Sequence, residues 1–343
     1  MTAKQRYFAY DFIRAVAIIM VVAVHALGEP GLSNAARWYD SIMRSILFLS
    51  NVLFFMLSGK LNLRVRSDSE LPDYYYRKFS RILLPTLVYI LLQSTYEQIR
   101  YQGAKLGQGL ILRAFIINSL GDYSGGVHWF IMALFGMLLA APILAPAVDN
   151  ITPGRRKAFV VLFLLFVAPH ILLCRTSHTF TWKYELTSFF GIFLYGAILD
   201  LDRATSIPKW KVALPTLFCI LTSASLLFLG FPHHPVNDNT PMYFISGVGF
   251  FVLLYGWSKE MKPSPAVSYI AKHSFGIYLC HIPLLLLIQP FFSIVPMPFR
   301  HLLVTAVTLL VVLFFVSLVD SVLVGPLQKI TDGIWAKHTN GAR

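Results

Sequence analysis

Residues 11–25 read DFIRAVAIIMVVAVH, an apolar run that is interrupted by Arg14 and again by His25. With its flanks the run is long enough for a helix across a membrane. Eleven positions at about 1.5 Å each put the two groups about 16 Å apart along the axis, and about 100° per residue puts them on the same face. An ionisable residue inside a membrane helix is costly, so it marks a functional site by default. We interpret this face as the first candidate site.

The composition indicates an integral membrane protein. The chain is 56% hydrophobic and 13% charged, with a mean hydropathy of +0.64, which excludes a soluble globule. The net charge of +13 is compatible with nucleic-acid binding, but Lys and Arg also orient membrane proteins by gathering in cytoplasmic loops. We therefore predict no nucleic-acid partner. We expect one transmembrane domain over residues 1–343 and no separate soluble domain.

The hydropathy pattern predicts an all-α integral membrane protein with about ten transmembrane helices. They lie near 8–27, 42–61, 80–98, 127–148, 158–174, 183–200, 212–230, 241–257, 268–289 and 301–324. With the N-terminus inside, 20 Lys and Arg residues lie on the cytoplasmic side and 8 on the far side. This bias predicts that both termini are cytoplasmic. Asp11 and Arg14 inside the first run favour a retained helix over a cleaved signal peptide.

This orientation gives a depth to each polar residue of the first helix. Asp11 and Arg14 lie in its cytoplasmic half, three residues apart, where they can form an ion pair. His25 lies near the outer end. A structural reading, a buried ion pair with an interfacial histidine, is as plausible from these residues alone as a catalytic one.

Basic residues stand at the cytoplasmic entrance of the predicted third helix. Arg77 and Arg81 are four residues apart and can project together, with Lys78 between them. Such residues usually serve topology and bind anionic headgroups. The functional alternative is a polyanion site, because guanidinium groups bind phosphate oxygens in a bidentate manner. Ser58, at the inner end of the second helix, is a further candidate.

Other polar residues lie on the fourth and ninth predicted helices. His128 precedes Trp129 at the same outer level as His25, although an interfacial histidine beside a tryptophan is common. Ser274, Tyr278 and His281 form a polar stripe at i, i+4 and i+7, which can also mean hydrogen bonding between helices.

The three cysteines predict neither a disulfide nor a metal site. Cys174, Cys219 and Cys280 are scattered, with no CxxC pair and no histidines at ligand spacing. Cys280 next to His281 could be a nucleophile with its base, but adjacent helical positions point about 100° apart. We expect no metal.

In order along the chain, these motifs resemble those of the acyltransferase-3 family of polytopic membrane acyltransferases, which includes bacterial O-acetyltransferases of cell-surface polysaccharides. The resemblance covers nearly the whole chain. It rests on Arg14 with His25, Phe54-Phe55 with Ser58-Gly59, Arg77-Lys78 with Arg81-Ile82 and Pro85, His128-Trp129-Phe130, and Ser274-Phe275-Gly276-Ile277-Tyr278 with His281. One departure is Lys60, where an aromatic residue usually follows the Ser-Gly pair.

The resemblance implies that His25 is catalytic and that acyl-coenzyme A, with acetyl-CoA as the default, is the donor. His25 would be a general base or, as an alternative, would itself be acylated. Arg14 would guide the pantetheine arm, and His128 would orient His25 or polarise the thioester. The donor-binding candidates are Arg77, Lys78, Arg81, Ser58, Ser274, Tyr278 and His281.

The implied acceptor is a hydroxyl of a surface glycan or a lipid-linked saccharide, and the implied location is the bacterial inner membrane, in contact with membrane lipids. A different class of protein also fits ten helices with intramembrane charges: a transporter or a flippase for lipid-linked sugars. No inverted repeat is apparent, and a transporter has no need of a phosphate-binding cluster.

Overall fold

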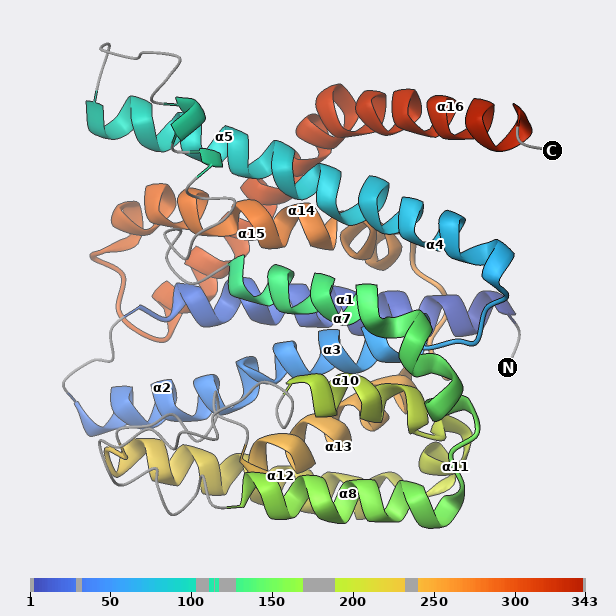
Figure 1. The fold of residues 1–343 in the computed structure, drawn as a ribbon. Helices are drawn as coiled ribbons and strands as arrows, with labels where there is room; N and C mark the ends of the chain where they lie inside the picture. Colours follow the sequence, from blue (N-terminus) through green and yellow to red (C-terminus); the bar gives the residue numbers. More distant parts are fainter. Residues whose placement is uncertain are drawn as a thin grey trace. The chain divides into compact units, whose positions relative to one another are not determined.

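The structure, a computed structural model, describes residues 3–28, 33–102, 111–113, 115–116, 128–168, 189–231 and 240–341. Within these residues all regular structure is helical, which confirms the all-α prediction for them (Figure 1). The helices are α1 (Ala3–Ala26), α2 (Asn34–Leu47), α3 (Leu49–Asn62), η1 (Asp68–Glu70), α4 (Leu71–Lys78), η2 (Phe79–Leu83), α5 (Leu84–Gln102), α7 (His128–Asp149), α8 (Pro153–Val167), α10 (Phe189–Ile198), α11 (Leu201–Ser206), α12 (Lys209–Phe228), α13 (Pro241–Ser258), α14 (Pro265–Ile288), η3 (Gln289–Phe292), α15 (Phe299–Val319), η4 (Asp320–Val324) and α16 (Gly325–Gly341).

Seven of the described helical segments are long and apolar enough to cross a membrane. They are Tyr7–Ala26, Asn34–Asn62, Trp129–Asp149, Lys209–Phe228, Pro241–Ser258, Pro265–Phe292 and Phe299–Thr339. Each contains or overlaps one of the ten predicted spans.

The other three predicted spans, 80–98, 158–174 and 183–200, have no counterpart among the seven. The first falls on η2 and α5, where the run from Gln93 to Gln98 is polar and lowers the hydropathy. In the described part, α8 ends at Val167 and α10 has only 10 residues, so each is shorter than a full span. The count of ten and the orientation stay predictions.

Large apolar side chains are exposed on the outward faces of several long helices. Phe218 on α12 is 70% exposed, and Leu310 and Phe314 on α15 are 70% and 74% exposed. Surfaces of this kind are rare on soluble proteins and are ordinary where a helix faces lipid. The exposure pattern therefore agrees with a multi-pass membrane protein.

The contacts within the chain form two compact units. Unit 1 contains residues 1–65, 141–274 and 289–306, and unit 2 contains residues 66–140, 275–288 and 307–343. In unit 1, α3 packs against α1, α10 and α13, and α12 packs against α2 and α13 (Figure 1). In unit 2, η2 packs against α4, α5 and α16.

Two glycines let α3 and α10 approach closely in unit 1. A Cβ atom at Gly59 would collide with the backbone carbonyl of Phe193, and one at Gly196 would collide with the backbone of Met56. Small residues at a helix crossing allow such an approach in membranes. Gly59, which follows Ser58, therefore serves the packing of α3 against α10.

Candidate active site

The polar face of α1 is present as the sequence predicts. The Asp11 carboxylate and the Arg14 guanidinium form an ion pair of 3.1 Å, and both side chains are partly buried. This confirms the predicted i, i+3 pair. The pair keeps both charges from being isolated at this depth.

His25 is exposed at the end of α1, although the residues around it are buried. Its Nδ1 lies 2.8 Å from the carbonyl oxygen of Val21. A carbonyl can only accept a hydrogen bond, so Nδ1 carries the hydrogen and the basic lone pair of the neutral ring is on Nε2. This tautomer suits a general base that acts through Nε2.

The helix face between Arg14 and His25 is closed. Ile18 and Val22 are 0% exposed and Val21 is 2% exposed, and all three lie on the side of the helix that carries the two polar residues. Buried apolar side chains thus separate Arg14 from His25 on this face of α1. A donor arm that runs from one to the other would have to displace them or follow another helix.

Four side chains that the sequence analysis did not single out gather around the end of α1. His301 Nε2 lies 2.9 Å from the carbonyl oxygen of Ala23, and His301 Nδ1 lies 2.7 Å from the Tyr39 hydroxyl. Arg44 donates to the Gly28 carbonyl at 2.7 Å and to the Asp40 carboxylate at 2.8 Å. The Asp40–Arg44 spacing of four residues was a signal for the ion pair, but nothing in the sequence marks a carbonyl as its second partner.

The basic cluster of unit 2 is centred on an aromatic ring. The Arg66 guanidinium lies 4.3 Å and the Lys78 ammonium 4.8 Å from the centre of the Tyr74 ring, an attractive arrangement for a cation. Burial, together with the positive charges of Arg66 and Arg77, lowers the pKa of Lys78 to about 8. Arg77 is exposed. An anion placed here would relieve the crowding of positive charge.

Arg81, the third predicted donor-binding cation, forms hydrogen bonds with side chains of α16. Its guanidinium donates to Gln328 at 2.8 Å and to Asp332 at 2.9 Å. Asp332 also accepts from the Tyr76 hydroxyl at 2.6 Å, and Trp335 stacks on the Tyr76 ring with centroids 4.7 Å apart. Arg81 thus has a structural use, holding the C-terminal helix against α4 and η2, besides any role toward a ligand.

The predicted polar stripe of α14 bonds largely to its own helix. The Ser274 hydroxyl donates to the Ala271 carbonyl at 2.8 Å, and His281 Nδ1 lies 2.7 Å from the Tyr278 carbonyl oxygen. His281 is fully buried, and the Tyr278 ring packs against Phe130 with centroids 5.1 Å apart. These contacts favour a packing role for the stripe.

The remaining predicted residues are placed as follows. Ser58 is partly buried on α3, and its carbonyl accepts from the Asn62 side chain at 2.8 Å. His128 begins α7, and its side chain lies outside the described residues. The loop around His233 and Asn237, predicted to be outside the cell, also falls outside them. Lys60 donates to the carbonyl of Leu199 at 2.7 Å, beside the end of α10.

Unit 2 contains an intramembrane carboxylate that the sequence analysis overlooked. Asp320, in the predicted tenth span, accepts a hydrogen bond of 2.9 Å from the Tyr89 hydroxyl. Gly276 makes room for this contact, because a Cβ there would lie 2.7 Å from the same hydroxyl. A lone carboxylate in an apolar run was a sufficient signal to find it.

A polar cavity of about 350 Å³ lies in unit 1. Its lining includes Tyr10 of α1, Lys60 of α3, Arg156 of α8, Asp202 of α11 and Asp200 just before α11.

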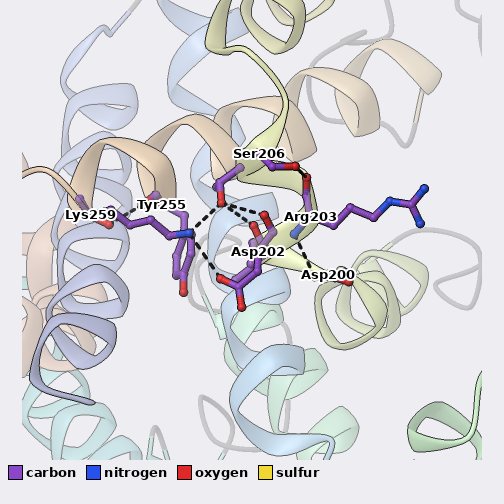
Figure 2. A network of polar contacts seen from close by, with 9 residues as sticks. Asp200, Asp202, Arg203, Ser206, Tyr255 and Lys259 are labelled. Carbon is purple, nitrogen blue, oxygen red and sulfur yellow. Dashed lines mark hydrogen bonds and ion pairs between the residues drawn. The ribbon is translucent and has the colours of Figure 1, made fainter. Parts of the chain in front are cut away.

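Most of these groups already have a structural partner. Asp200 caps α11, because its carboxylate accepts a hydrogen bond of 3.1 Å from the Arg203 backbone N–H. Figure 2 shows Lys259 reaching Asp202, at 3.4 Å, and lying over the Tyr255 ring.

The predicted site residues are divided between the two units. Arg14, His25, Ser58 and Ser274 belong to unit 1, and Arg77, Lys78, Arg81, His128, Tyr278 and His281 belong to unit 2. Among the described residues no group of three or more His, Cys, Asp or Glu side chains is placed to hold a metal ion.

The comparison with known proteins identifies the family of the chain. The family model described as an acyltransferase domain matches residues 7–325, nearly the whole chain. Searches of curated proteins and of solved structures found no match. A family match of this extent settles the class of protein, a membrane acyltransferase, and places the Arg14–His25 helix inside the matched region. This chain belongs to the acyltransferase-3 family.

Proposed function

We propose that this chain is a membrane-bound O-acyltransferase that moves an acetyl group from cytoplasmic acetyl-CoA to a hydroxyl of a cell-surface glycan or of its lipid-linked precursor. The family supplies the class of reaction. Acetyl is chosen because it is the commonest acyl group in the family the chain resembles, and the bacterial inner membrane is the location that follows from such an acceptor.

The state of His25 supports this function best. The ring is exposed at an otherwise buried helix end, with its Nδ1 hydrogen donated to Val21 and its lone pair on Nε2. Nε2 would take the proton of the acceptor hydroxyl while that oxygen attacks the thioester carbonyl carbon. The new C–O bond then forms, the C–S bond breaks, and the proton passes to the sulfur of coenzyme A.

The donor's phosphates would rest on the cation cluster of unit 2. Lys78 and Arg77 have the charge for this, and guanidinium and ammonium groups make charge-assisted hydrogen bonds to phosphate oxygens. Arg81 can join them if it exchanges part of its contact with Asp332. Arg14 would guide the pantetheine arm, which from there would reach His25 by displacing Ile18, Val21 and Val22 or by following another helix.

Replacement of His25 tests the proposal. Loss of a general base typically costs about 10²–10⁴-fold in rate, so His25→Ala should abolish detectable acetylation of surface glycans by mass spectrometry. Binding of acetyl-CoA to the purified variant, measured by calorimetry, should stay near the wild-type value because the phosphates are held elsewhere.

His338→Ala is the matched control, because His338 is also an exposed histidine on a helix, α16, and is not one of the predicted site residues. It should leave acetylation unchanged. A His25→Ala protein that acetylates glycans at the wild-type rate would refute the proposed mechanism.

A further inference from the structure

The last turn of α1 is held by side chains that come from distant parts of unit 1. His301 reaches the Ala23 carbonyl from α15, and Arg44 reaches the Gly28 carbonyl from α2. Ala23 and Gly28 stand two residues before and three residues after His25. The backbone that carries His25 is therefore fixed on both sides.

His301 is buried and both of its ring nitrogens are used. It is 3% exposed. Because the Ala23 carbonyl can only accept, Nε2 donates to it, and in the neutral ring Nδ1 accepts from the Tyr39 hydroxyl at 2.7 Å. The Tyr39 and His301 rings also meet edge to face, with centroids 5.8 Å apart. Tyr39 thereby fixes both the tautomer and the orientation of His301.

The Arg44 contact secures the turn that follows the helix. Arg44 is itself anchored by Asp40, one turn earlier on α2, at 2.8 Å. Gly28 has a φ of +67°, a left-handed conformation that ends α1, and a Cβ there would lie 3.0 Å from the Gln289 side chain. A glycine at this place is the usual way to end a helix and turn the chain.

We propose that His301, oriented by Tyr39, is a positioning residue for the acyl transfer: it holds the last turn of α1 so that His25 keeps one geometry toward the reacting groups. This rests on the proposed function. The His25 ring is exposed, so the packing of neighbouring side chains does less to fix it than it does for the buried residues around it. The backbone that carries the ring therefore contributes to its geometry.

The expected effect on rate is large because catalysis is sensitive to position. A displacement of about 1 Å at a reacting group can cost about 10²-fold in rate. A hydrogen bond to the helix backbone from a fixed, buried ring is a contact that keeps such displacements small. Binding of the donor's phosphates, which involves other residues, has no reason to change.

Three variants separate positioning from general stability. His301→Leu removes both hydrogen bonds, His301→Gln keeps a donor near the place of Nε2, and Tyr39→Phe removes only one hydroxyl. Thr305→Val is the matched control. Thr305 lies one turn further along α15, and among the described residues its hydroxyl bonds only within that helix, to the His301 carbonyl at 2.7 Å.

Two measurements are made on each purified variant. The first is amide hydrogen exchange in peptides that cover residues 18–28, with peptides covering residues 5–14 as an internal reference. The second is the transfer rate, as kcat and as KM for acetyl-CoA. For His301→Leu we expect exchange in 18–28 to be about tenfold faster and kcat to be about 10–100-fold lower at unchanged KM.

His301→Gln should recover most of both properties, and Tyr39→Phe should give a smaller loss, which also serves if His301→Leu does not fold. Unchanged exchange in residues 18–28 would overturn the proposal, and so would faster exchange with an unchanged kcat. Activity that survives His25→Ala would overturn the proposed function. The hydrogen-exchange measurement does not depend on that function, so it tests separately whether His301 stabilises the last turn of α1.

Discussion

Lys78 and Arg81, about one helical turn apart, are held in different ways. Arg81 has a carboxylate and an amide as partners, whereas Lys78 lies over the Tyr74 ring with the charges of Arg66 and Arg77 nearby. Of the two cations, Lys78 has its charge opposed by its surroundings. It is therefore the residue whose charge a bound phosphate would stabilise most, and its protonation should be visible in donor binding.

We predict that affinity for coenzyme A falls as pH rises through about 8, the pKa to which burial and the charges of Arg66 and Arg77 lower Lys78. Below this pH Lys78 is charged and can bind phosphate, and above it the charge is lost while the arginines keep theirs. Titration calorimetry with coenzyme A between pH 6.5 and 9.5 measures this. Lys78→Arg should remove the fall, and Lys78→Gln should bind weakly at every pH.

Unfolding does not explain such a fall. The pKa of Lys78 is about 8 in the folded protein and 10.5 without the surroundings of the fold. Between these two pH values the unfolded chain therefore binds the proton of Lys78 and the folded protein does not. The contribution of Lys78 to the free energy of unfolding is therefore fully present above 10.5 and is lost as pH falls through about 8. An affinity that is the same at pH 7 and pH 9 would exclude Lys78 from the donor site.

Arg14 has two roles that a double replacement separates. Arg14→Ala leaves the Asp11 carboxylate without the 3.1 Å ion pair inside the membrane, so the yield of folded protein and the activity should both fall. Asp11→Ala with Arg14→Ala should recover the yield, measured by gel filtration of the solubilised protein, but not the transfer. If the double variant recovers transfer as well, Arg14 has a structural role only.

At the scale of helices, the crossing of α3 and α10 depends on two glycines and shapes one end of unit 1. Gly196 meets the Met56 backbone, and Gly59 meets that of Phe193. The same crossing places Lys60 at the Leu199 carbonyl and forms part of the polar cavity. A change in the separation of these helices should therefore lower the free energy of unfolding.

We predict that Gly196→Ala costs about 1–3 kcal/mol in the free energy of unfolding, because the new methyl group forces the two backbones apart. The thermal midpoint of the detergent-solubilised protein should fall by several degrees. Gly136→Ala on α7 is the control, since a Cβ there has no neighbour within 4 Å in the described part of the chain, and it should leave the midpoint unchanged or raised. Equal midpoints for the two variants would contradict the close approach.

Contacts inside one helix could be predicted from the sequence, whereas contacts between helices could not. Helix geometry fixes the distance between Asp11 and Arg14, so their ion pair follows from spacing alone. His301 binds a carbonyl 278 residues away, and no side-chain pattern marks a carbonyl as a partner. The donor-binding prediction for Arg81 rested on its spacing from Arg77. Nothing in the sequence indicates that Asp332, 251 residues later, is its partner.

At the scale of the molecule, each end of unit 1 contains residues that the predicted topology places on the same side of the membrane: cytoplasmic at one end and outer at the other. Lys60, Asp149, Arg156 and Asp200 line the polar cavity, and all belong to predicted cytoplasmic loops or their edges. At the opposite end, Arg37 donates to the Phe228 carbonyl at 2.8 Å and Arg44 to that of Gly28, all near predicted outer ends. Unit 1 is thus consistent with the predicted alternation of spans.

The cavity also bears on two of the three predicted spans that have no counterpart among the seven segments, 158–174 and 183–200. Arg156 at the start of α8 and Ile198 at the end of α10 line it together, so these two residues lie at the same end of unit 1. The predicted topology places both on the cytoplasmic side, which needs an even number of crossings between them. The predicted spans 158–174 and 183–200 supply two, and they keep both termini on one side.

Cysteine labelling tests this topology. In a background without Cys174, Cys219 and Cys280, single cysteines at Asn150 and Asn237 should react from opposite sides of the membrane: position 150 only from the cytoplasm and position 237 only from outside. Lys262→Cys, between the predicted eighth and ninth spans, should follow position 150. Reaction of position 237 from the cytoplasmic side would contradict the ten-span arrangement, because an odd number of crossings would then be missing before it, and His25 would have to be placed again relative to the donor.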